Sequence, residues 1–323
     1  GYTEAIPAEE MMRWSINTHR GCGGGCSFCS LALHQGRRVA SRSRISILRE
    51  VQSLTRMTGW TGSISDVGGP SANMWGARCT LDPARCTRTS CLFPAVCPGF
   101  QVDQSAGLEL LREVARQDGV RHVRVASGLR HDLALQAPRA LKALIMEFTG
   151  GQLKVAPEHI SENVLRGMRK PSLEVFERFL EEFRRHSEAA GKEQYVIPYL
   201  ISAFPGCTEQ DMRELADWLR ARGWTPRQVQ CFIPTPGTVA TAMYFTGLDP
   251  EGNPIHVARS DAERLRQHGL LSPERGRKPV RCEGSARPPR SRRGGGAKPS
   301  GALAEGRKPD RAPRTGRPGR RPG

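Results

Sequence analysis

The chain contains 323 residues, of which 37% are hydrophobic and 25% are charged, enough for one large domain or two small ones. Its formal net charge is +17, but 16 Lys and Arg against four Asp and Glu lie from residue 273 to the end, so the charge alone is no evidence for a folded nucleic-acid-binding domain. The longest nearly apolar stretch, residues 195–204, is about half as long as a membrane-spanning helix requires, which excludes such a helix.

Strand-like and helix-like patterns alternate along the chain. Short apolar runs predict six strands, at residues 14–17, 63–67, 122–126, 152–156, 195–202 and 228–233. Apolar residues at helical spacing predict helices between them, with the stripes Ile47, Leu48, Val51 and Leu54; Leu108, Leu111 and Val114; Leu141, Leu144, Ile145 and Phe148; Leu173, Phe176, Phe179, Leu180 and Phe183; and Met212, Leu215, Ala216 and Leu219. Pro138 suits the first turn of the third of these helices, and Thr208 with Asp211 forms a capping box ahead of the fifth.

Six strand–helix alternations predict an α/β fold with a parallel sheet covered by helices, either a barrel or a doubly wound open sheet. In both architectures the chemistry lies at the carboxyl ends of the strands. Residues from about 75 to 100 interrupt the alternation, because they hold four cysteines and show little periodicity. They predict an insertion that is held together by something other than an apolar core.

A first group of cysteines directly follows the first predicted strand. Cys22, Cys26 and Cys29 have the spacing C-x3-C-x2-C, with four glycines between residues 21 and 25. Glycines let a backbone wrap tightly and direct its N–H groups toward sulfide or thiolate. A four-iron cluster normally takes four thiolates, so three would leave one iron open to a small molecule. The alternatives are a structural zinc site completed by His19 or His34, and three thiols without a metal.

The motif, with Phe28 before its last cysteine, resembles the signature of radical S-adenosylmethionine (SAM) enzymes. Residues 15–22, 64–73, 126–132, 153–159 and 191–199 further resemble the YgiQ-type family of radical SAM proteins, and the resemblance covers about residues 5 to 248. It implies a partial (β/α)6 TIM-like barrel in which Cys22, Cys26 and Cys29 hold a [4Fe–4S] cluster and the fourth iron binds SAM. One electron then splits SAM into methionine and a 5′-deoxyadenosyl radical, which takes a hydrogen atom from a substrate that no residue identifies.

The same resemblance implies SAM-contacting residues at the strand ends. They follow the second, third and fourth strands and the next helix, and are Gly68, Gly69, Ser127, Arg130, Glu158 and Arg169. The glycines would present backbone groups to the SAM amino group, while hydroxyl, guanidinium and carboxylate groups would bind the ribose or the methionine carboxylate. A tight turn, an exposed arginine and a helix cap are the plainer readings of these residues.

A second group of cysteines lies in the insertion. Cys79, Cys86, Cys91 and Cys97 have the spacing C-x6-C-x4-C-x5-C. Four thiolates in about 20 residues with almost no core predict a metal that folds the segment, in a closed coordination shell. A second iron–sulfur cluster, zinc and unligated thiols are the three candidates.

The domain prediction places a radical SAM domain at residues 1–250 and a mostly disordered basic tail at 251–323. From residue 273 onward the tail is rich in Gly, Pro and Arg and has no aromatic residue, so it cannot bury enough apolar surface to offset its ordering entropy. The chain resembles one half of family members that are about twice as long, and its start at Gly1 without Met predicts a fragment.

Two functions follow from these observations. The first is a radical SAM enzyme with an unknown substrate, served by a one-electron donor such as a flavodoxin or ferredoxin. The second is a non-enzymatic iron–sulfur or zinc protein that carries electrons or touches nucleic acid through its tail. Binding of nucleic acid is not expected, because the tail lacks aromatic residues for stacking. The opening residues predict no signal peptide, and ten cysteines without one predict a cytoplasmic protein with no membrane partner.

Overall fold

The computed structural model describes residues 4, 6, 9–226 and 228–271. All of them belong to the first of the two compact units into which the chain divides, residues 1–280. The part of the predicted tail from residue 272 onward lies outside the described residues.

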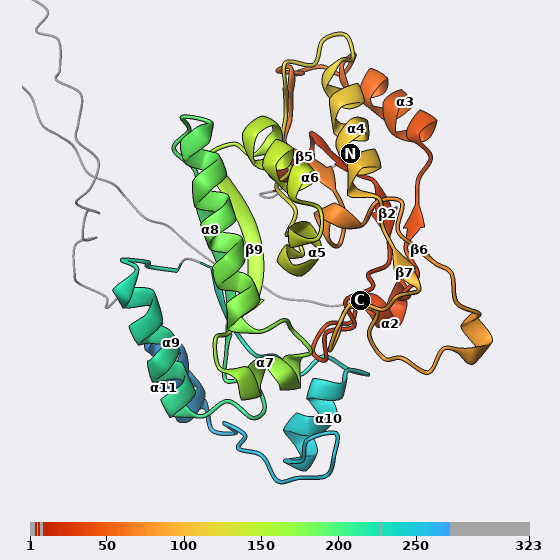
Figure 1. The fold of residues 1–323 in the computed structure, drawn as a ribbon. Coiled ribbons are helices and arrows are strands. Elements are labelled where there is room, and N and C mark those ends of the chain that lie inside the picture. The colour runs from red at the N-terminus through yellow and green to blue at the C-terminus, as the bar shows by residue number, and fades with distance from the viewer. Residues whose placement is uncertain (1–3, 5, 7–8, 227, 272–323) are drawn as a thin grey trace, which may run out of the picture. The chain divides into compact units, whose positions relative to one another are not determined.

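The described residues form short strands and helices that largely follow the predicted alternation (Figure 1). The strands are β1 (Ser15–Asn17), β2 (His19–Arg20), β3 (Ala40–Ser41), β4 (Ser63–Ile64), β5 (Asp66–Gly68), β6 (Arg78–Cys79), β7 (Phe100–Gln101), β8 (His122–Val123), β9 (Gln152–Glu158), β10 (Tyr195–Ser202) and β11 (Gln228–Cys231). The α-helices are α1 (Glu9–Met12), α2 (Leu31–His34), α3 (Arg44–Leu54), α4 (Gln104–Ala115), α5 (His131–Leu135), α6 (Pro138–Ala143), α7 (Glu162–Met168), α8 (Leu173–Ala189), α9 (Glu209–Ala221), α10 (Val239–Thr246) and α11 (Asp261–Gly269). Irregular helical turns occur at η1 (Ala72–Met74), η2 (Pro83–Arg85) and η3 (Leu144–Phe148).

The six predicted strand regions pair in parallel and in chain order. β1 pairs with β5, β4 with β8, β9 with β10, and β10 with β11. Leu129, beyond the end of β8, bridges in parallel to Val155 on β9 and so links the two halves of the series. The pairs β2–β3 and β6–β7 are antiparallel and lie outside it. The parallel α/β architecture is confirmed, whereas this pairing does not by itself define a barrel.

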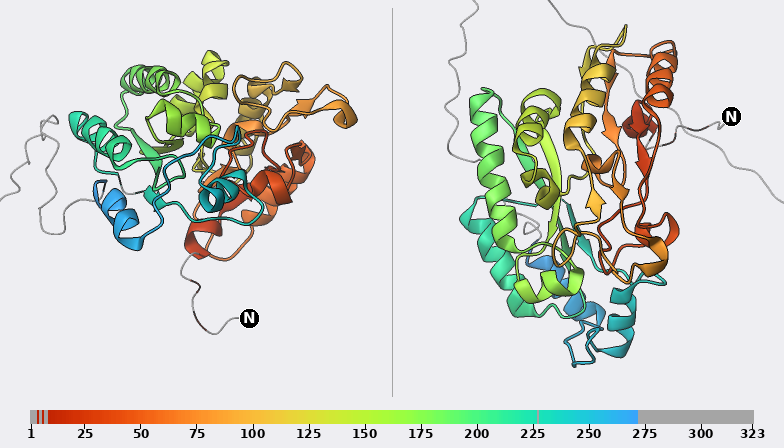
Figure 2. Two further views of the ribbon diagram at one scale, coloured as in Figure 1. Left: turned by 90° about the horizontal axis from the view of Figure 1, so that it is seen from below. Right: turned by 45° about the vertical axis from the view of Figure 1, so that its right-hand side comes forward.

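The helices bury their predicted apolar stripes against these strands. In α3 the buried residues include Ile47 and Val51, which pack with strand residues such as Ile64. Phe176 and Phe179 of α8 pack on β9, beside which α8 lies in Figures 1 and 2. The helix α9 and strand β10 contribute to a further cluster. Because the helices cover the faces of the strands, the connecting loops lie at the carboxyl ends of the strands.

The described structure continues past residue 250, where the predicted tail begins. Ser260 caps α11, and its hydroxyl accepts the Glu263 N–H. Gln267 of α11 is fully buried and Leu271 is 4% exposed, within the cluster formed by α9 and β10. Residues up to 271 therefore contribute to the packed unit. None of the helices in the described part of the chain has the length and apolarity that a membrane crossing requires.

Candidate functional site

The first three cysteines lie on residues 21–29, which we call the cysteine loop, between β2 and α2. The loop is fastened at Ser27, whose N–H donates to the Met168 carbonyl at 3.1 Å and whose carbonyl accepts the Ala240 N–H at 2.9 Å. These bonds hold the loop against the end of α7 and the start of α10, two helices that lie near each other below the end of β9 in Figure 1. The loop thus lies at the carboxyl ends of the parallel strands, as predicted.

The sulfur atoms converge around Gly24. Its N–H donates to Cys22 Sγ at 3.4 Å. A Cβ added to Gly24 would lie 3.4 Å from Cys22 Sγ, 3.6 Å from Cys26 Sγ and 3.3 Å from Arg130 Nη1, so the glycine leaves a cradle between two sulfurs and a cation. Such a cradle fits an anionic sulfur cluster, which N–H groups and positive charges stabilise.

The electrostatics also place the three thiols together. Burial raises the pKa of Cys22, and the neighbouring Cys26 raises it further, while the Gly24 N–H lowers it. Burial raises the pKa of Cys29, and the thiols of Cys26 and Cys22 add to that rise. Burial thus favours the neutral thiol form of Cys22 and Cys29. A metal cluster would supply the positive charge that turns them into thiolates.

The predicted residue Arg130 reaches the cysteine loop from the end of the third strand region. The residue is 6% exposed, and its Nη1 lies 3.8 Å from Cys26 Sγ. Nε and Nη2 donate to the two carboxylate oxygens of Asp132, which are therefore bound bidentately. Burial alone would raise the pKa of Asp132, but Arg130 lowers it to about 2. The arginine is thus a fixed cation. The two N–H groups with which it could bind a carboxylate bidentately are already bound to Asp132, which sequence reasoning did not foresee.

Glu158 ends β9 with a positive φ of 71° and is buried. Lys170 Nζ lies 3.5 Å from Glu158 Oε1, and both side chains are at most 10% exposed. Burial raises the pKa of Glu158, and Lys170 opposes that rise. Arg169, which was predicted to contact SAM, adopts a left-handed conformation at the end of α7, and this turns the next residue inward. Lys170 was missed by sequence reasoning, although it lies only one position from the predicted residue.

Gly68 and Gly69 lie beside the strand that leads into the cysteine loop. Thr18 donates both its N–H, at 2.7 Å, and its hydroxyl, at 2.9 Å, to the Gly68 carbonyl. A Cβ on Gly69 would lie only 2.6–2.9 Å from the imidazole of His19. The close approach of the His19 ring to this backbone favours glycine at residue 69, in addition to any contact with a ligand.

Ser127 is held by a carboxylate that the sequence did not single out. Asp66 accepts the Ala126 N–H at 2.8 Å and the Ser127 N–H at 3.0 Å, and it also accepts the Ser127 hydroxyl. The Ser127 hydroxyl hydrogen is therefore engaged, and only its lone pairs are available to a ligand. Asp66 organises the turn after the third strand, which could have been inferred only from its position in the middle of an apolar run.

The alternative zinc site would need His19 or His34. The His19 ring faces Gly69, and its Nδ1 lies 2.9 Å from Thr18 Oγ1, while His34 is exposed on α2. Within residues 9–226 and 228–271 no three His, Cys, Asp or Glu side chains come together closely enough to hold one metal ion. In a [4Fe–4S] cluster each thiolate binds a different iron, so its ligands lie farther apart than the ligands of a single ion. The cysteine loop fits the cluster better.

Three cysteines of the second group line a separate hollow on the insertion, and the fourth, Cys97, is buried in the apolar cluster beside it. Cys79 is exposed, Cys86 and Cys91 are half-buried and Cys97 is buried. The hollow has a volume of about 290 Å³ and is lined by Arg37, Arg38, Val39, Ala77, Arg78, Cys79, Cys86, Cys91 and Phe100. Burial raises the pKa of Cys91, an effect that Arg37 opposes and the other three thiols of the group reinforce. Three of the four cysteines thus share one hollow, and a common metal centre for all four stays a prediction.

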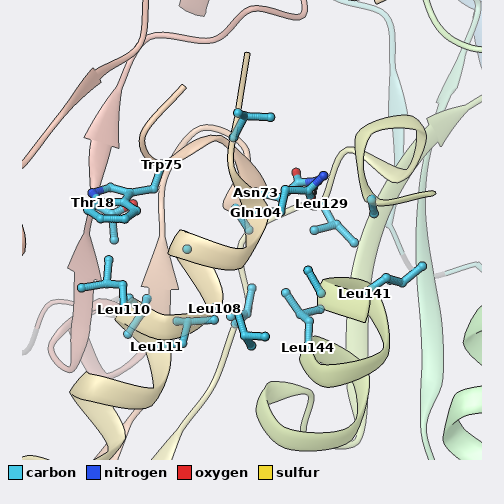
Figure 3. A pocket seen from close by; sticks show the side chains of 17 residues that line it. Thr18, Asn73, Trp75, Gln104, Leu108, Leu110, Leu111, Leu129, Leu141 and Leu144 are labelled. Carbon is cyan, nitrogen blue, oxygen red and sulfur yellow. Dashed lines mark hydrogen bonds between the residues drawn. The ribbon is translucent and has the colours of Figure 1, made fainter. Parts of the chain in front are cut away.

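A third feature is an apolar cavity of about 50 Å³ between helices α4 and α6 and the strands (Figure 3). Leucines such as Leu108, Leu111 and Leu144 dominate its lining. Asn73, at its edge, exchanges two hydrogen bonds with the Arg130 backbone, at 3.0 and 3.1 Å. The cavity is a gap in the apolar core. It is connected to the cysteine loop through Asn73, whose side chain holds the backbone of Arg130.

Comparisons with known proteins agree with this geometry. The family model of the radical SAM superfamily matches residues 16–219, and that of a domain of unknown function (DUF3362) matches residues 227–272. The UPF0313 protein GSU2873 of Geobacter sulfurreducens is 51% identical over 271 residues, which cover 83% of this chain and 45% of that protein. The UPF0313 protein YgiQ of Salmonella typhimurium is 44% identical over 275 residues, which cover 82% of this chain and 38% of that protein. The chain spans less than half the length of these curated relatives.

A solved structure of the radical SAM methyltransferase TsrM from Kitasatospora setae, with cobalamin and a [4Fe–4S] cluster bound, is 17% identical to the chain. The match covers 79% of this chain and 46% of that one, with a TM-score of 0.46.

Proposed function

This chain belongs to the radical SAM superfamily, and from that premise we propose that it is an enzyme that reductively cleaves SAM. Cys22, Cys26 and Cys29 would hold a [4Fe–4S] cluster with one open iron. The proposal rests on the cradle at Gly24, around which the sulfurs of Cys22 and Cys26 and the guanidinium of Arg130 lie. When bound, the cluster supplies one electron to SAM, which yields methionine and a 5′-deoxyadenosyl radical that abstracts a hydrogen atom from substrate.

The residues around the loop would stabilise negative charge on the thiolates. The Gly24 N–H already points at Cys22 Sγ, and Arg130 Nη1 points at Cys26 Sγ. Both groups are fixed before any ligand arrives, Gly24 by the wrapped loop and Arg130 by Asp132 and Asn73. A preorganised donor stabilises charge without the cost of reorienting when the charge develops.

The SAM-binding residues would lie at the neighbouring strand ends. We assign backbone contacts to Gly68 and Gly69, and polar contacts to Glu158 with its partner Lys170. A buried carboxylate beside an ammonium group can bind a hydroxyl pair while the ammonium attracts a carboxylate, which suits the ribose and methionine parts of SAM. Ser127 offers an acceptor to the same region, because Asp66 takes its hydrogen. Arg169 stays a weaker assignment, because Lys170 occupies the position next to Glu158.

We further propose that the parallel series curves into the partial (β/α)6 barrel of the superfamily. The support is the chain-order pairing from β1 to β11 through the Leu129–Val155 bridge. A one-electron donor of the flavodoxin or ferredoxin class would supply the electron, and a reducing cytoplasm would keep the thiols available for iron.

Anaerobic reconstitution of the chain with iron and sulfide tests the proposal. With dithionite and SAM, the wild-type chain is expected to form 5′-deoxyadenosine slowly even without substrate, and SAM is expected to change the EPR spectrum of the reduced cluster. Cys26→Ala should abolish both signals because it removes a cluster ligand. Cys231→Ala is the matched control, since Cys231 ends β11 outside both cysteine groups.

The two functions predicted from the sequence are separated by this experiment. If the cluster forms and is reduced, yet SAM neither alters its spectrum nor is cleaved, the enzyme proposal fails and an electron-carrying iron–sulfur protein takes its place. If Cys26→Ala leaves iron content and spectrum unchanged, the loop is not the cluster site.

A further inference from the structure

The insertion that carries Cys79, Cys86, Cys91 and Cys97 is built directly onto the cysteine loop. The Cys91 N–H donates to the Gly23 carbonyl at 2.9 Å, and the Ser90 hydroxyl donates to the Gly24 carbonyl at 2.5 Å. A Cβ on Gly25 would lie 2.5 Å from the Thr89 carbonyl oxygen, so the two backbones touch there. The glycines of the loop therefore lie next to the thiols on one side and contact the insertion on the other.

The two cysteine groups also share one apolar cluster. Cys97 is buried in it, and Cys22 and Cys91 pack partly buried against it. A Cβ on Gly23 would lie 2.7 Å from the ring of Phe100, which also lines the hollow at the second group. The two cysteine groups thus share backbone contacts and one apolar cluster.

The hollow that Cys79, Cys86 and Cys91 line favours an anion. Arg37, Arg38 and Arg78 line it, and no carboxylate contributes to its described lining. Arg88 closes the segment by donating to the carbonyls of Phe93 and Ala95 at 3.1 and 2.9 Å. A cluster ligated by four thiolates carries a net negative charge, which surrounding guanidinium groups and the exclusion of water stabilise.

We propose that Cys79, Cys86, Cys91 and Cys97 bind a second iron–sulfur cluster, next to the first site. The hollow, with a volume of about 290 Å³, leaves room for a cluster in which each thiolate binds its own iron, whereas one zinc ion at about 2.3 Å from each sulfur would draw the four sulfurs into a compact tetrahedron. Few apolar contacts stabilise the folded segment, because most of residues 79–91 contribute nothing to the apolar clusters, so a bound metal would supply the missing stability. This inference does not require that the first site cleaves SAM.

Metal analysis of the full chain tests the proposal in a background without the first site. The variant Cys22→Ala/Cys26→Ala/Cys29→Ala, reconstituted anaerobically with iron and sulfide and then desalted, is expected to retain about four irons and four sulfides per chain. The further substitution Cys86→Ser should remove that iron, whereas Cys231→Ala in the same background should leave it. Cys86 is half-buried on the insertion, so its replacement leaves the packed core intact, which circular dichroism and thermal unfolding check.

A second measurement reports on the proximity of the two sites. When both clusters of the wild-type chain are reduced, spin–spin coupling should broaden its EPR spectrum beyond the sum of the spectra of the two single-site proteins. The proposal is overturned if the triple variant retains no iron, if it binds one zinc ion per chain in place of iron when both metals are offered, or if Cys86→Ser leaves its iron unchanged. A spectrum that equals the sum overturns the placement of the two clusters side by side. None of these readouts uses SAM, so a failure of the proposed function remains distinguishable.

Discussion

The pair formed by Arg130 and Asp132 shows how one residue can be both fixed and functional. The carboxylate takes Nε and Nη2, which leaves Nη1 directed at Cys26 Sγ. A positive charge beside a cluster ligand stabilises the reduced cluster, which is more negative than the oxidised one. The arginine is therefore expected to set the reduction potential at the loop rather than to bind a free carboxylate.

Replacing Arg130 by Gln tests this role. The substitution should lower the midpoint potential of the reconstituted cluster by tens of millivolts, since about 59 mV corresponds to a tenfold change for one electron. Potentiometric EPR titration measures the shift. The control is Arg130→Gln/Asp132→Asn, which removes both charges and should restore part of the potential. An unchanged potential in the single variant would show that the guanidinium does not act on the cluster.

His159, directly after Glu158, is a buried neutral histidine. Its Nδ1 accepts the Ser161 N–H at 3.0 Å, so the ring proton lies on Nε2, which is 3.6 Å from Cys207 Sγ. Burial lowers the pKa of His159 to about 4, and the nearby Asp211 opposes this only in part. Because the unfolded chain binds this proton at a pKa near 6.5, stability is complete above about pH 6.5 and falls as the pH drops toward 4.

The variant His159→Asn should weaken that pH dependence, because an amide oxygen can replace Nδ1 as the acceptor and cannot take up a proton. Between pH 7 and pH 5 the wild-type chain is expected to lose about 1–2 kcal/mol more unfolding free energy than the variant, at about 1.4 kcal/mol for each pKa unit. Urea unfolding at both pH values measures the difference. The exposed His122→Asn is the control and should lose as much as the wild type.

At the scale of elements, the turn after β5 lies close to the His19 side chain at Gly69. The Gly69 substitution to Ala would push a methyl group against the His19 imidazole, at 2.6–2.9 Å. We expect a loss of about 1–3 kcal/mol of unfolding free energy, as for other overpacked positions, measured by urea denaturation. Gly128→Ala is the matched control, because no atom lies within 4 Å of its added Cβ. Equal losses for the two variants would contradict the steric explanation.

The capping box of α9 gives a second test at this scale. Thr208 Oγ1 accepts the Asp211 N–H at 3.2 Å, and Asp211 in turn accepts the Thr208 N–H at 2.8 Å. Thr208→Ala should cost about 0.5–2 kcal/mol of unfolding free energy, whereas Thr208→Ser, which keeps the hydroxyl, should cost little. A thermal or urea unfolding curve that does not distinguish Ala from Ser would show that the cap is not what begins the helix.

Elements were predictable where the signal is local. The capping box at Thr208 and the apolar stripe of α8 appear where the sequence places them, because periodicity and caps act over a few residues. The predicted strand at 63–67 instead divides into β4 and β5, and β4 pairs with β8 while β5 pairs with β1. The function of Asp66 in the turn after β8 depends on a partner about 60 residues away, which no local pattern encodes.

At the scale of the whole molecule, the cysteine spacing predicts two groups of thiols but not how the groups lie relative to each other. The contact between Cys91 and Gly23, and the reach of Arg130 to Cys26 across 104 residues, arise from the order of the strands. The predicted boundary of the packed unit, at residue 250, lies before α11. The composition of this helix is polar, and its few buried residues leave almost no apolar pattern in the sequence.

Two truncations separate these parts of the chain. α11 contributes Gln267, whose amide donates to the Cys207 carbonyl at 3.3 Å, and it leads to the buried Leu271. A chain that ends at residue 250 loses both and should be destabilised by about 2–4 kcal/mol, from one apolar side chain and one buried hydrogen bond. A chain that ends at residue 271 should keep the midpoint of thermal unfolding and the iron content of the full chain, because the composition of the remaining 52 residues predicts no packed core. A loss of cooperative unfolding in the longer chain would mean that the basic tail stabilises the fold, and an unchanged midpoint in the shorter one would mean that α11 does not.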